Sequence, residues 1–211
     1  MMKYSGMPWA MWTLFADPFT KNLIGIMGCD EAAAKEIRRR AKLKYKEIIA
    51  ELPEFEKADH FKMNIVNCAV LCAFVLNMPK RPDVEKLTVY YRQSVMTPLV
   101  KKIFRASAKS KYTEKDLAAM RATAELKAAD RNPFSWSMDL FEYEDGSGYE
   151  ARFYKCSICE LTRKLGLFDL TPALCRIDYD MSDAGGRTDF IREYTLASGG
   201  PYCDCGYHKK K

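Results

Sequence analysis

The sequence of 211 residues lacks the features that mark several large classes of protein. It has only 9 prolines and 11 glycines, and 48% of its residues are hydrophobic, which excludes a disordered, collagen-like or low-complexity chain. Its two histidines, His60 and His208, offer little material for a histidine-rich metal site or a Ser-His-Asp triad. The P-loop, a GxGxxG turn after a strand, the HExxH motif and the GxSxG nucleophile elbow are all absent from the sequence, so none of these familiar signatures points to a function.

The sequence also lacks a long uninterrupted apolar run. Its first apolar stretch is broken by Asp17, Pro18 and Lys21, and no apolar core leads to a small-residue cleavage site, so we expect no secretion signal. A second stretch, residues 63–78, contains three asparagines and is shorter than the roughly 20 residues that cross a bilayer. It is predicted to form a buried core helix. We therefore expect a cytoplasmic protein with reduced thiols and no membrane span.

Neither sign of charge is in large excess. The chain has 34 lysines and arginines against 28 aspartates and glutamates, a net charge of +6, and Lys209, Lys210 and Lys211 supply three of those charges. The basic side chains of residues 30–52 are diluted by glutamates, which indicates a solvated helix face, and no known nucleic-acid motif accompanies them. We expect no nucleic-acid partner, and the sequence is compatible with a homo-oligomer.

Residues 30–131 follow a helical pattern. Apolar side chains recur at helical spacing over residues 30–52 and again over residues 83–107. Pro98 is expected to kink or divide the second of these segments, because proline lacks the amide donor and crowds the preceding turn.

The period of the pattern changes after Pro133. Polar and apolar residues alternate there on either side of the turn 144–148, which predicts a β-hairpin. The elements expected are strands over 135–143 and 149–154, short helices over 156–165 and near 172–181, and strands over 189–197 and 202–208.

The expected fold class is therefore α+β. A helical N-terminal part, residues 1–133, is followed by a ββααββ part, residues 134–208, with a small antiparallel sheet. A chain of this length is expected to form a single domain over residues 1–211.

Cysteine is unusually frequent in this sequence, with eight residues. Cys203 and Cys205, two apart on an expected strand, would share one face of the sheet, while Asp204 would point to the other. Five of the eight cysteines lie in the last part of the chain: Cys156, Cys159, Cys175, Cys203 and Cys205.

Three interpretations of these thiols remain open. They are small buried apolar groups, a common fate of reduced cysteine. Alternatively, four thiolates from this set of five converge on zinc or an iron–sulfur cluster. In the third interpretation one thiol is a nucleophile or an acid–base group whose pKa Arg192 lowers. No cofactor is predicted, and zinc is the metal that the second interpretation would require.

Residues 153–207 resemble the signature of the L-2-amino-thiazoline-4-carboxylic acid hydrolase family. The resemblance is close over about a quarter of the chain, and it is more specific for membership than for activity. The matching residues are Cys156, Leu165, Gly166, Cys175, Asp178, Arg192, Glu193, Tyr194, Thr195, Leu196, Ala197, Gly199, Gly200, Cys203 and Asp204.

Two cysteines depart from the family pattern. Relatives usually carry an aromatic residue where this chain has Cys205, and Cys159 also lies outside the pattern. If the family chemistry needs only the recurrent cysteines, these two are not required by it. If this branch has acquired a metal or redox site, they are its additions.

The resemblance implies hydrolytic opening of a cyclic amidine. Water would attack the ring carbon between nitrogen and sulfur, and the C–S bond would break to give an N-carbamoyl cysteine. This chemistry needs a general base, a proton donor for the departing sulfur, and a cation for the substrate carboxylate.

The resemblance also implies roles for individual residues. Asp178 or Asp204 would be the general base, and Cys175 or Cys203 would be the proton donor or a covalent nucleophile. The substrate would be bound by the remaining members of the implied site: Arg192 for its carboxylate, the backbone amides of Gly199 and Gly200 for developing charge, and Thr195 and Cys156.

The expected function is thus that of a hydrolase acting on a small-molecule substrate, a cyclic amidine or thiazoline carboxylate. Two alternatives come from other classes of protein. One is a non-catalytic module that binds a small hydrophobic or thiol-reactive ligand, and the other is a protein with a thiolate-bound metal.

Overall fold

The computed structural model describes residues 1–55, 59 and 61–211, so His60 lies outside the described residues. The chain forms two compact units. The first consists of Met1–Thr97 and Ile158–Leu174, and the second of Pro98–Ser157 and Cys175–Lys211. That residues 1–211 behave as a single domain stays a prediction.

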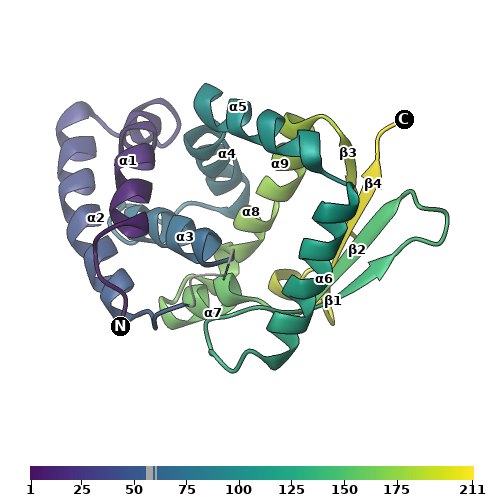
Figure 1. The fold of residues 1–211 in the computed structure, drawn as a ribbon. Helices are drawn as coiled ribbons and strands as arrows, with labels where there is room; N and C mark the ends of the chain where they lie inside the picture. The colour runs from purple at the N-terminus through teal and green to yellow at the C-terminus, as the bar shows by residue number, and fades with distance from the viewer. Residues whose placement is uncertain (56–58, 60) are drawn as a thin grey trace. The chain divides into compact units, whose positions relative to one another are not determined.

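The first unit is helical (Figure 1). Asp30 begins its second helix, because the Asp30 carboxylate accepts a hydrogen bond from the Ala33 backbone N–H at 2.7 Å. The helices of this unit are α1 (Met7–Gly25), α2 (Glu31–Glu51), α3 (Lys62–Val75), α4 (Val84–Val95), α7 (Ser157–Lys164), the 3₁₀ turn η2 (Phe168–Leu170) and α8 (Thr171–Cys175), with one residue of α7 and one of α8 in the second unit.

Helix α3 forms the centre of the first unit, as its apolar sequence predicts. It is apolar on all sides and buried from Val66 to Val75 except at Asn67. The ring of Phe74 stacks on Trp12 at 5.7 Å and on Phe19 at 5.3 Å between ring centroids. None of the described helices is both long and apolar enough to cross a membrane.

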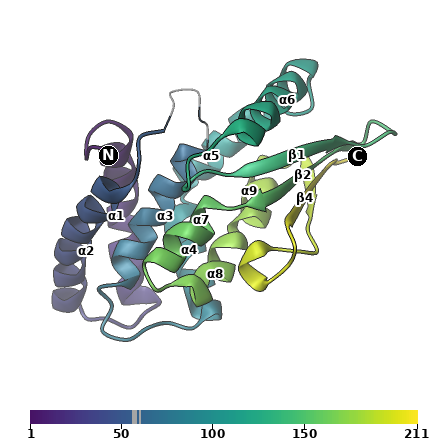
Figure 2. The ribbon, with the colours of Figure 1, turned by 90° about the horizontal axis from the view of Figure 1, so that it is seen from below.

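The second unit combines helices with a sheet (Figure 2). Pro98 divides the expected helical segment, because α4 ends at Val95 and a new helix begins at Pro98 itself. The elements of this unit are α5 (Pro98–Ser107), the 3₁₀ turn η1 (Ala108–Ser110), α6 (Glu114–Ala129), β1 (Ser137–Glu142), β2 (Gly148–Lys155), α9 (Ile177–Gly185), β3 (Thr188–Ile191), the 3₁₀ turn η3 (Leu196–Ser198) and β4 (Cys203–Lys209).

The four strands form one antiparallel sheet in the order β1-β2-β4-β3. Helix α6 packs beside β1 and α9 beside β3 (Figures 1 and 2). In the register, Ala151 lies opposite Cys205 and Phe153 opposite Cys203, while Arg152 lies opposite Asp204. Cys203 and Cys205 therefore share the buried face of the sheet, and Asp204 lies on the other face.

The α+β class with a small antiparallel sheet is confirmed, but two expected elements have different limits. The helix expected near residues 172–181 is two helices, α8 and α9, and the Cys175 carbonyl at their junction accepts a hydrogen bond from Arg192. The strand expected over residues 189–197 ends at Ile191, because the chain then turns to place backbone N–H groups on the Asp204 carboxylate.

Candidate active site

Arg192 is the centre of a cluster of polar groups in the second unit. It follows β3 directly, after the pairing of Ile191 with Gly206, and its charge acts on the thiol of Cys205. Its Nη1 donates to Asp178 Oδ2 at 2.6 Å, and its Nη2 donates to the Cys175 carbonyl at 2.7 Å. The guanidinium thus holds the junction of α8 and α9 against the edge of the sheet.

Two aromatic rings surround the same guanidinium. Its central carbon lies 5.4 Å from the ring centroid of Tyr179 and 5.3 Å from that of Phe190. The Arg192 side chain is consequently only 5% exposed. Sequence reasoning missed both rings. Phe190, two residues before Arg192 on an expected strand, could have been found from strand alternation.

Asp178 is the acidic partner of Arg192 in this cluster. Burial raises the pKa of the Asp178 carboxyl, whereas the positive charge of Arg192 opposes that shift. Although burial alone would lower the pKa of Arg192, the charge of Asp178 raises it. The Asp178 side chain is 36% exposed, whereas that of its partner Arg192 is 5% exposed.

Three thiols lie around this ion pair. Burial raises the pKa of Cys175 and of Cys205, and Arg192 opposes the shift in both. Burial also raises the pKa of Cys203. The charges of Asp178 and Arg192 act on all three thiols, which shows that the groups are close together. At neutral pH these cysteines are protonated thiols.

The thiol of Cys203 accepts a hydrogen bond that the sequence did not indicate. The backbone N–H of Leu196 donates to Cys203 Sγ at 3.2 Å. This bond favours the thiolate of Cys203 and opposes the effect of burial on its pKa. Among the three thiols, Cys203 is the one with this backbone donor.

Thr195, Gly199 and Gly200 form the turn that presents the Leu196 N–H to this thiol. Thr195 Oγ1 accepts from the Ser198 N–H at 3.1 Å, and the Gly200 N–H donates to the Thr195 carbonyl at 2.9 Å. Gly199 has φ 82°, and a Cβ on Gly200 would lie 3.0 Å from the Thr195 carbonyl oxygen. Since the Gly199 N–H also donates within the turn, the two glycines shape the loop.

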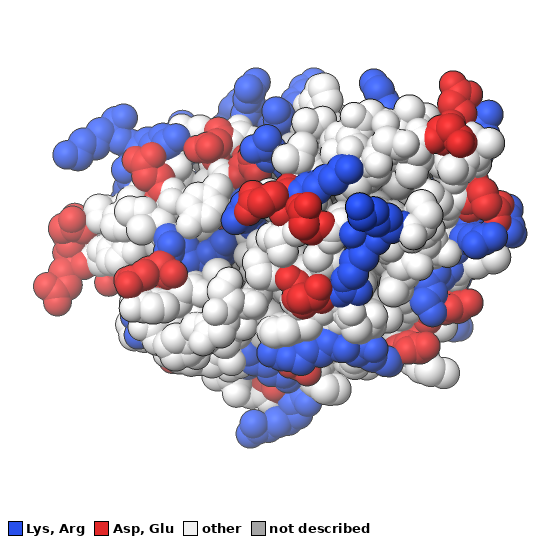
Figure 3. All heavy atoms as spheres, turned by 180° about the vertical axis from the view of Figure 1, so that it is seen from behind, with Lys and Arg blue, Asp and Glu red and all other residues white. Residues whose placement is uncertain are grey.

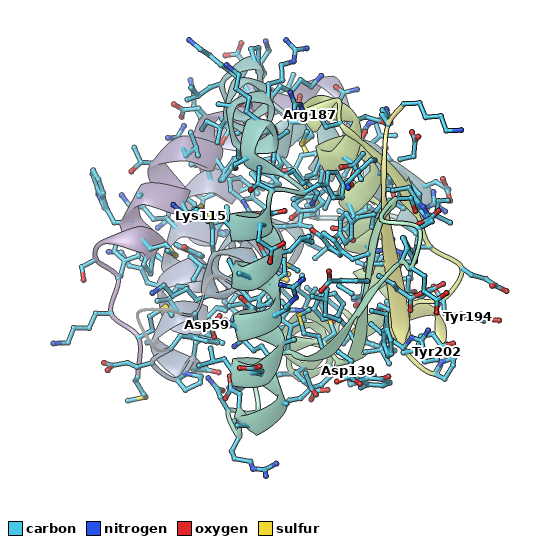
Figure 4. All side chains as sticks on the ribbon, turned by 45° about the vertical axis from the view of Figure 1, so that its right-hand side comes forward. Asp59, Lys115, Asp139, Arg187, Tyr194 and Tyr202 are labelled. Carbon is cyan, nitrogen blue, oxygen red and sulfur yellow. The ribbon has the colours of Figure 1, made fainter. Side chains whose placement is uncertain are left out.

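Asp204 is separated from the thiols by the sheet itself. Its two carboxylate oxygens accept hydrogen bonds from the backbone N–H groups of Glu193 at 3.0 Å and Tyr194 at 2.6 Å. Tyr194 and Tyr202 lie side by side at this end of β4, with ring centroids 5.6 Å apart (Figure 4). Of the two candidate bases, only Asp178 is thus near the thiols.

The remaining two cysteines of the C-terminal set, Cys156 and Cys159, lie before α7 and within it, respectively. Cys156 directly precedes the helix, and its charge would act on both Cys175 and Cys203, so it belongs to the cluster. Cys159 is buried within α7. All eight cysteines are thiols rather than disulfides. In the part of the chain that the structure describes, no three His, Cys, Asp or Glu side chains are placed to hold a metal ion, which gives no support to a thiolate metal site.

The surface charges are interspersed rather than gathered by sign. On the face seen in Figure 3, lysines and arginines alternate with aspartates and glutamates. This distribution agrees with the small net charge of +6 and marks out no broad basic surface on that face.

One protein-family model matches the part of the chain that contains this cluster. The family model of L-2-amino-thiazoline-4-carboxylic acid hydrolase matches residues 63–207, which is more than half of the chain and includes every member of the cluster. The chain belongs to this family. No curated protein and no solved structure matches it.

Proposed function

We propose that this member of the family hydrolyses the ring of a small cyclic amidine carboxylate, with L-2-amino-thiazoline-4-carboxylate as the reference substrate. Membership in the family supports this assignment. The structural observation that carries it is the pairing of the buried Arg192 with the reachable carboxylate of Asp178, next to three protonated thiols.

The reaction consumes one water molecule and loses no atom. The water oxygen bonds to the ring carbon between nitrogen and sulfur, the electron pair of the ring C=N double bond moves to nitrogen, and one water proton passes to Asp178. The other water proton passes to the ring nitrogen, so that the oxygen becomes the carbonyl oxygen of the product as the C–S bond breaks. The C–S bond then breaks, its electron pair stays on sulfur, and sulfur takes up a proton. The product is N-carbamoyl cysteine with a free thiol.

Asp178 suits the role of general base in this scheme. Its raised pKa makes it a stronger base than an ordinary surface aspartate, and its exposed fraction lets water and substrate reach it. Arg192 holds the carboxylate in one orientation and favours its ionised form. The same carboxyl group, once protonated, can return the proton to the departing sulfur.

The thiols of Cys175 and Cys203 are assigned to hydrogen bonding rather than to nucleophilic attack. Because burial raises the pKa of both, the thiolate needed for attack is disfavoured in each case. Their S–H groups can donate to the charge that develops on sulfur.

Arg192 is assigned to the substrate carboxylate as well as to Asp178. A guanidinium has five N–H donors, and Arg192 already donates to Asp178 and to the Cys175 carbonyl from a side chain that is only 5% exposed. A substrate carboxylate would therefore have to displace one of these partners to be bound. The charge of Arg192 would then fix the substrate with the ring carbon facing Asp178.

The test is incubation of the purified protein with L-2-amino-thiazoline-4-carboxylate. We expect a new free thiol, detected with a thiol reagent, and a product of substrate mass plus one water, detected by mass spectrometry. Binding of the compound without release of thiol would favour the non-catalytic ligand-binding module instead.

A further inference from the structure

A small pocket lies in the first unit, lined by the loop between α1 and α2 and by the connection between α3 and α4. Its volume is about 170 Å³, and its lining extends into the first turn of α4. All lining residues fall within Met1–Thr97, so the pocket shares no residue with the cluster around Arg192. They are Met27, Cys29, Met78, Pro79, Lys80, Arg81, Pro82, Asp83 and Lys86.

The backbone on both sides of this pocket is held in place. On the α1–α2 side, Gly28 has φ 79°, and the Cys29 N–H donates to the Leu23 carbonyl at 3.0 Å. On the α3–α4 side, Pro79 and Pro82 have a fixed φ, which limits the conformations of this connection. A pocket with fixed walls binds a ligand at a lower entropic cost than one that must first be ordered.

The charged part of the lining has an excess of positive charge. Arg81 is paired with Asp169. The Asp83 carboxylate accepts the Lys86 backbone N–H at 2.7 Å, as the N-cap of α4. The side chains of Lys80 and Lys86 are exposed, and neither ammonium group is in an ion pair with a residue that the structure describes. Two positive charges at the pocket are therefore available to a bound anion.

The size and the chemistry of the pocket together define its ligand. An apolar cavity of about 150 Å³ holds one benzene ring, so this pocket has room for a body of that size. The side chains of Met27 and Met78, the two prolines and the thiol of Cys29 can cover such a body, and its removal from water favours binding. The ammonium groups of Lys80 and Lys86 suit a carboxylate on that body.

We propose that this pocket binds a small organic anion, a compact apolar body the size of a benzene ring that carries one carboxylate. The body lies between the two loops, and Lys80 and Lys86 bind the carboxylate. The pocket is thus a second ligand site, and it does not depend on the function proposed for the cluster around Arg192.

The test is calorimetric titration of the wild type with benzoate and with benzamide, which have the same ring but differ in charge. We expect benzoate to bind about tenfold more tightly at low ionic strength, because only the anion pairs with the two lysines. Added salt should reduce this difference, since the charges are exposed to solvent. Acetate, which has the charge without the ring, should bind about tenfold more weakly than benzoate.

Lysine variants test which side chains bind the carboxylate. Lys86→Gln and Lys80→Gln should each weaken benzoate binding about threefold to fivefold and leave benzamide binding unchanged, since each removes one exposed ion pair. The matched control is Lys42→Gln, which removes an exposed lysine of α2 that does not line the pocket. It should leave both affinities at their wild-type values.

The thiol of Cys29 reports where benzoate binds. Cys29 lines the pocket and is partly exposed, so iodoacetamide can alkylate it, and mass spectrometry of peptides measures the rate. Saturating benzoate should slow this reaction at Cys29. It should leave the rate unchanged at Cys156, a partly exposed thiol of the second unit.

The proposal is overturned if benzamide binds as tightly as benzoate, or if benzoate shows no saturable binding. It is also overturned if Lys86→Gln and Lys80→Gln behave like Lys42→Gln. Protection of Cys156 without protection of Cys29 would place benzoate in the candidate active site instead. None of these measurements uses the ring-opening assay, so this inference and the proposed function stand or fail separately.

Discussion

Two groups of cysteines in this chain differ in what surrounds them. Cys68 and Cys72 lie one turn apart in α3, with their Sγ atoms 3.8 Å apart, in a helix whose other buried residues are apolar. Cys175, Cys203 and Cys205 are also largely buried, but the charges of Arg192 and Asp178 act on each of them.

The difference shows that the number of cysteines does not by itself indicate chemistry. A thiol in an apolar helix contributes packing and nothing for a substrate to meet. A thiol beside a buried guanidinium and a reachable carboxylate can take part in proton transfer and charge stabilisation. The five predictions below test this difference, and they run from the largest expected effect to the smallest.

Asp178→Asn should reduce kcat for ring opening by about 10²–10⁴-fold, because the amide cannot accept the proton of water. Steady-state thiol release measures the effect. The amide keeps the size and one oxygen of the carboxylate, so circular dichroism should show the wild-type fold.

Asp204→Asn is the matched control for that variant. It changes a carboxylate on the opposite face of the sheet that accepts from the N–H groups of Glu193 and Tyr194. We expect a lower Tm and a kcat near that of the wild type. The reverse result, with Asp204→Asn inactive and Asp178→Asn active, would assign the base to Asp204.

Cys175→Ala and Cys72→Ala test the two groups of thiols directly. Cys175→Ala should lower kcat about tenfold to hundredfold, because the departing sulfur loses an S–H donor. Cys72→Ala should leave kcat unchanged and destabilise the fold by about 1 kcal/mol, which lowers Tm by roughly 2–4 °C in a protein of this size. Equal losses of kcat in the two variants would remove the distinction between the groups.

The acid limb of the pH profile tests the environment of Asp178. An ordinary aspartate has a pKa of about 3.9, and burial raises that of Asp178. As the pH falls, Asp178 is protonated earlier than a surface aspartate, so kcat/KM should drop about tenfold per pH unit below a pKa that is higher than that of an ordinary aspartate. An acid limb at or below the pKa of an ordinary aspartate would rule out Asp178 as the base.

The raised pKa of Asp178 should also affect how the free energy of unfolding depends on pH. The direction of this effect is opposite to that of most carboxylates. A carboxyl whose pKa is higher in the folded state binds its proton more tightly there than in the unfolded chain. Protonation of Asp178 therefore increases the free energy of unfolding as the pH falls through its raised pKa. A surface carboxylate such as Glu142, whose pKa the Arg121 guanidinium lowers, has the usual sign and loses its contribution to the free energy of unfolding as the pH falls.

Cys205→Ala should have the smallest effect of the five. This residue falls outside the family pattern, and its thiol adds to the packing of the buried sheet face beside Arg192. We expect kcat/KM within about threefold of the wild type in the ring-opening assay. A loss as large as that of Cys175→Ala would make Cys205 part of the reaction.

Much of the fold follows from local sequence signals. The apolar residues 63–78 predict a core helix, and Pro98 predicts the break between α4 and α5. The alternation around Gly146, together with its φ of 67°, accounts for the β1–β2 hairpin. Each of these signals acts over a few residues, which is why a sequence pattern suffices.

The sequence predicted which residues belong to the candidate site, but not how they contact one another. Strand alternation correctly placed Cys203 and Cys205 on one face and Asp204 on the other. The pairing of Arg192 with Asp178 could not be predicted, because it depends on how α9 packs beside β3. Glu193 and Asp189 were equally available partners by sequence, and only the packing decides between them.

The most direct test of the account is ring opening of L-2-amino-thiazoline-4-carboxylate by three proteins measured in parallel: the wild type, Asp178→Asn and Cys72→Ala. The account predicts equal rates of thiol release for the wild type and Cys72→Ala, and a rate at least about 10²-fold lower for Asp178→Asn. A wild-type rate in Asp178→Asn, or no release from the wild type itself, would contradict it.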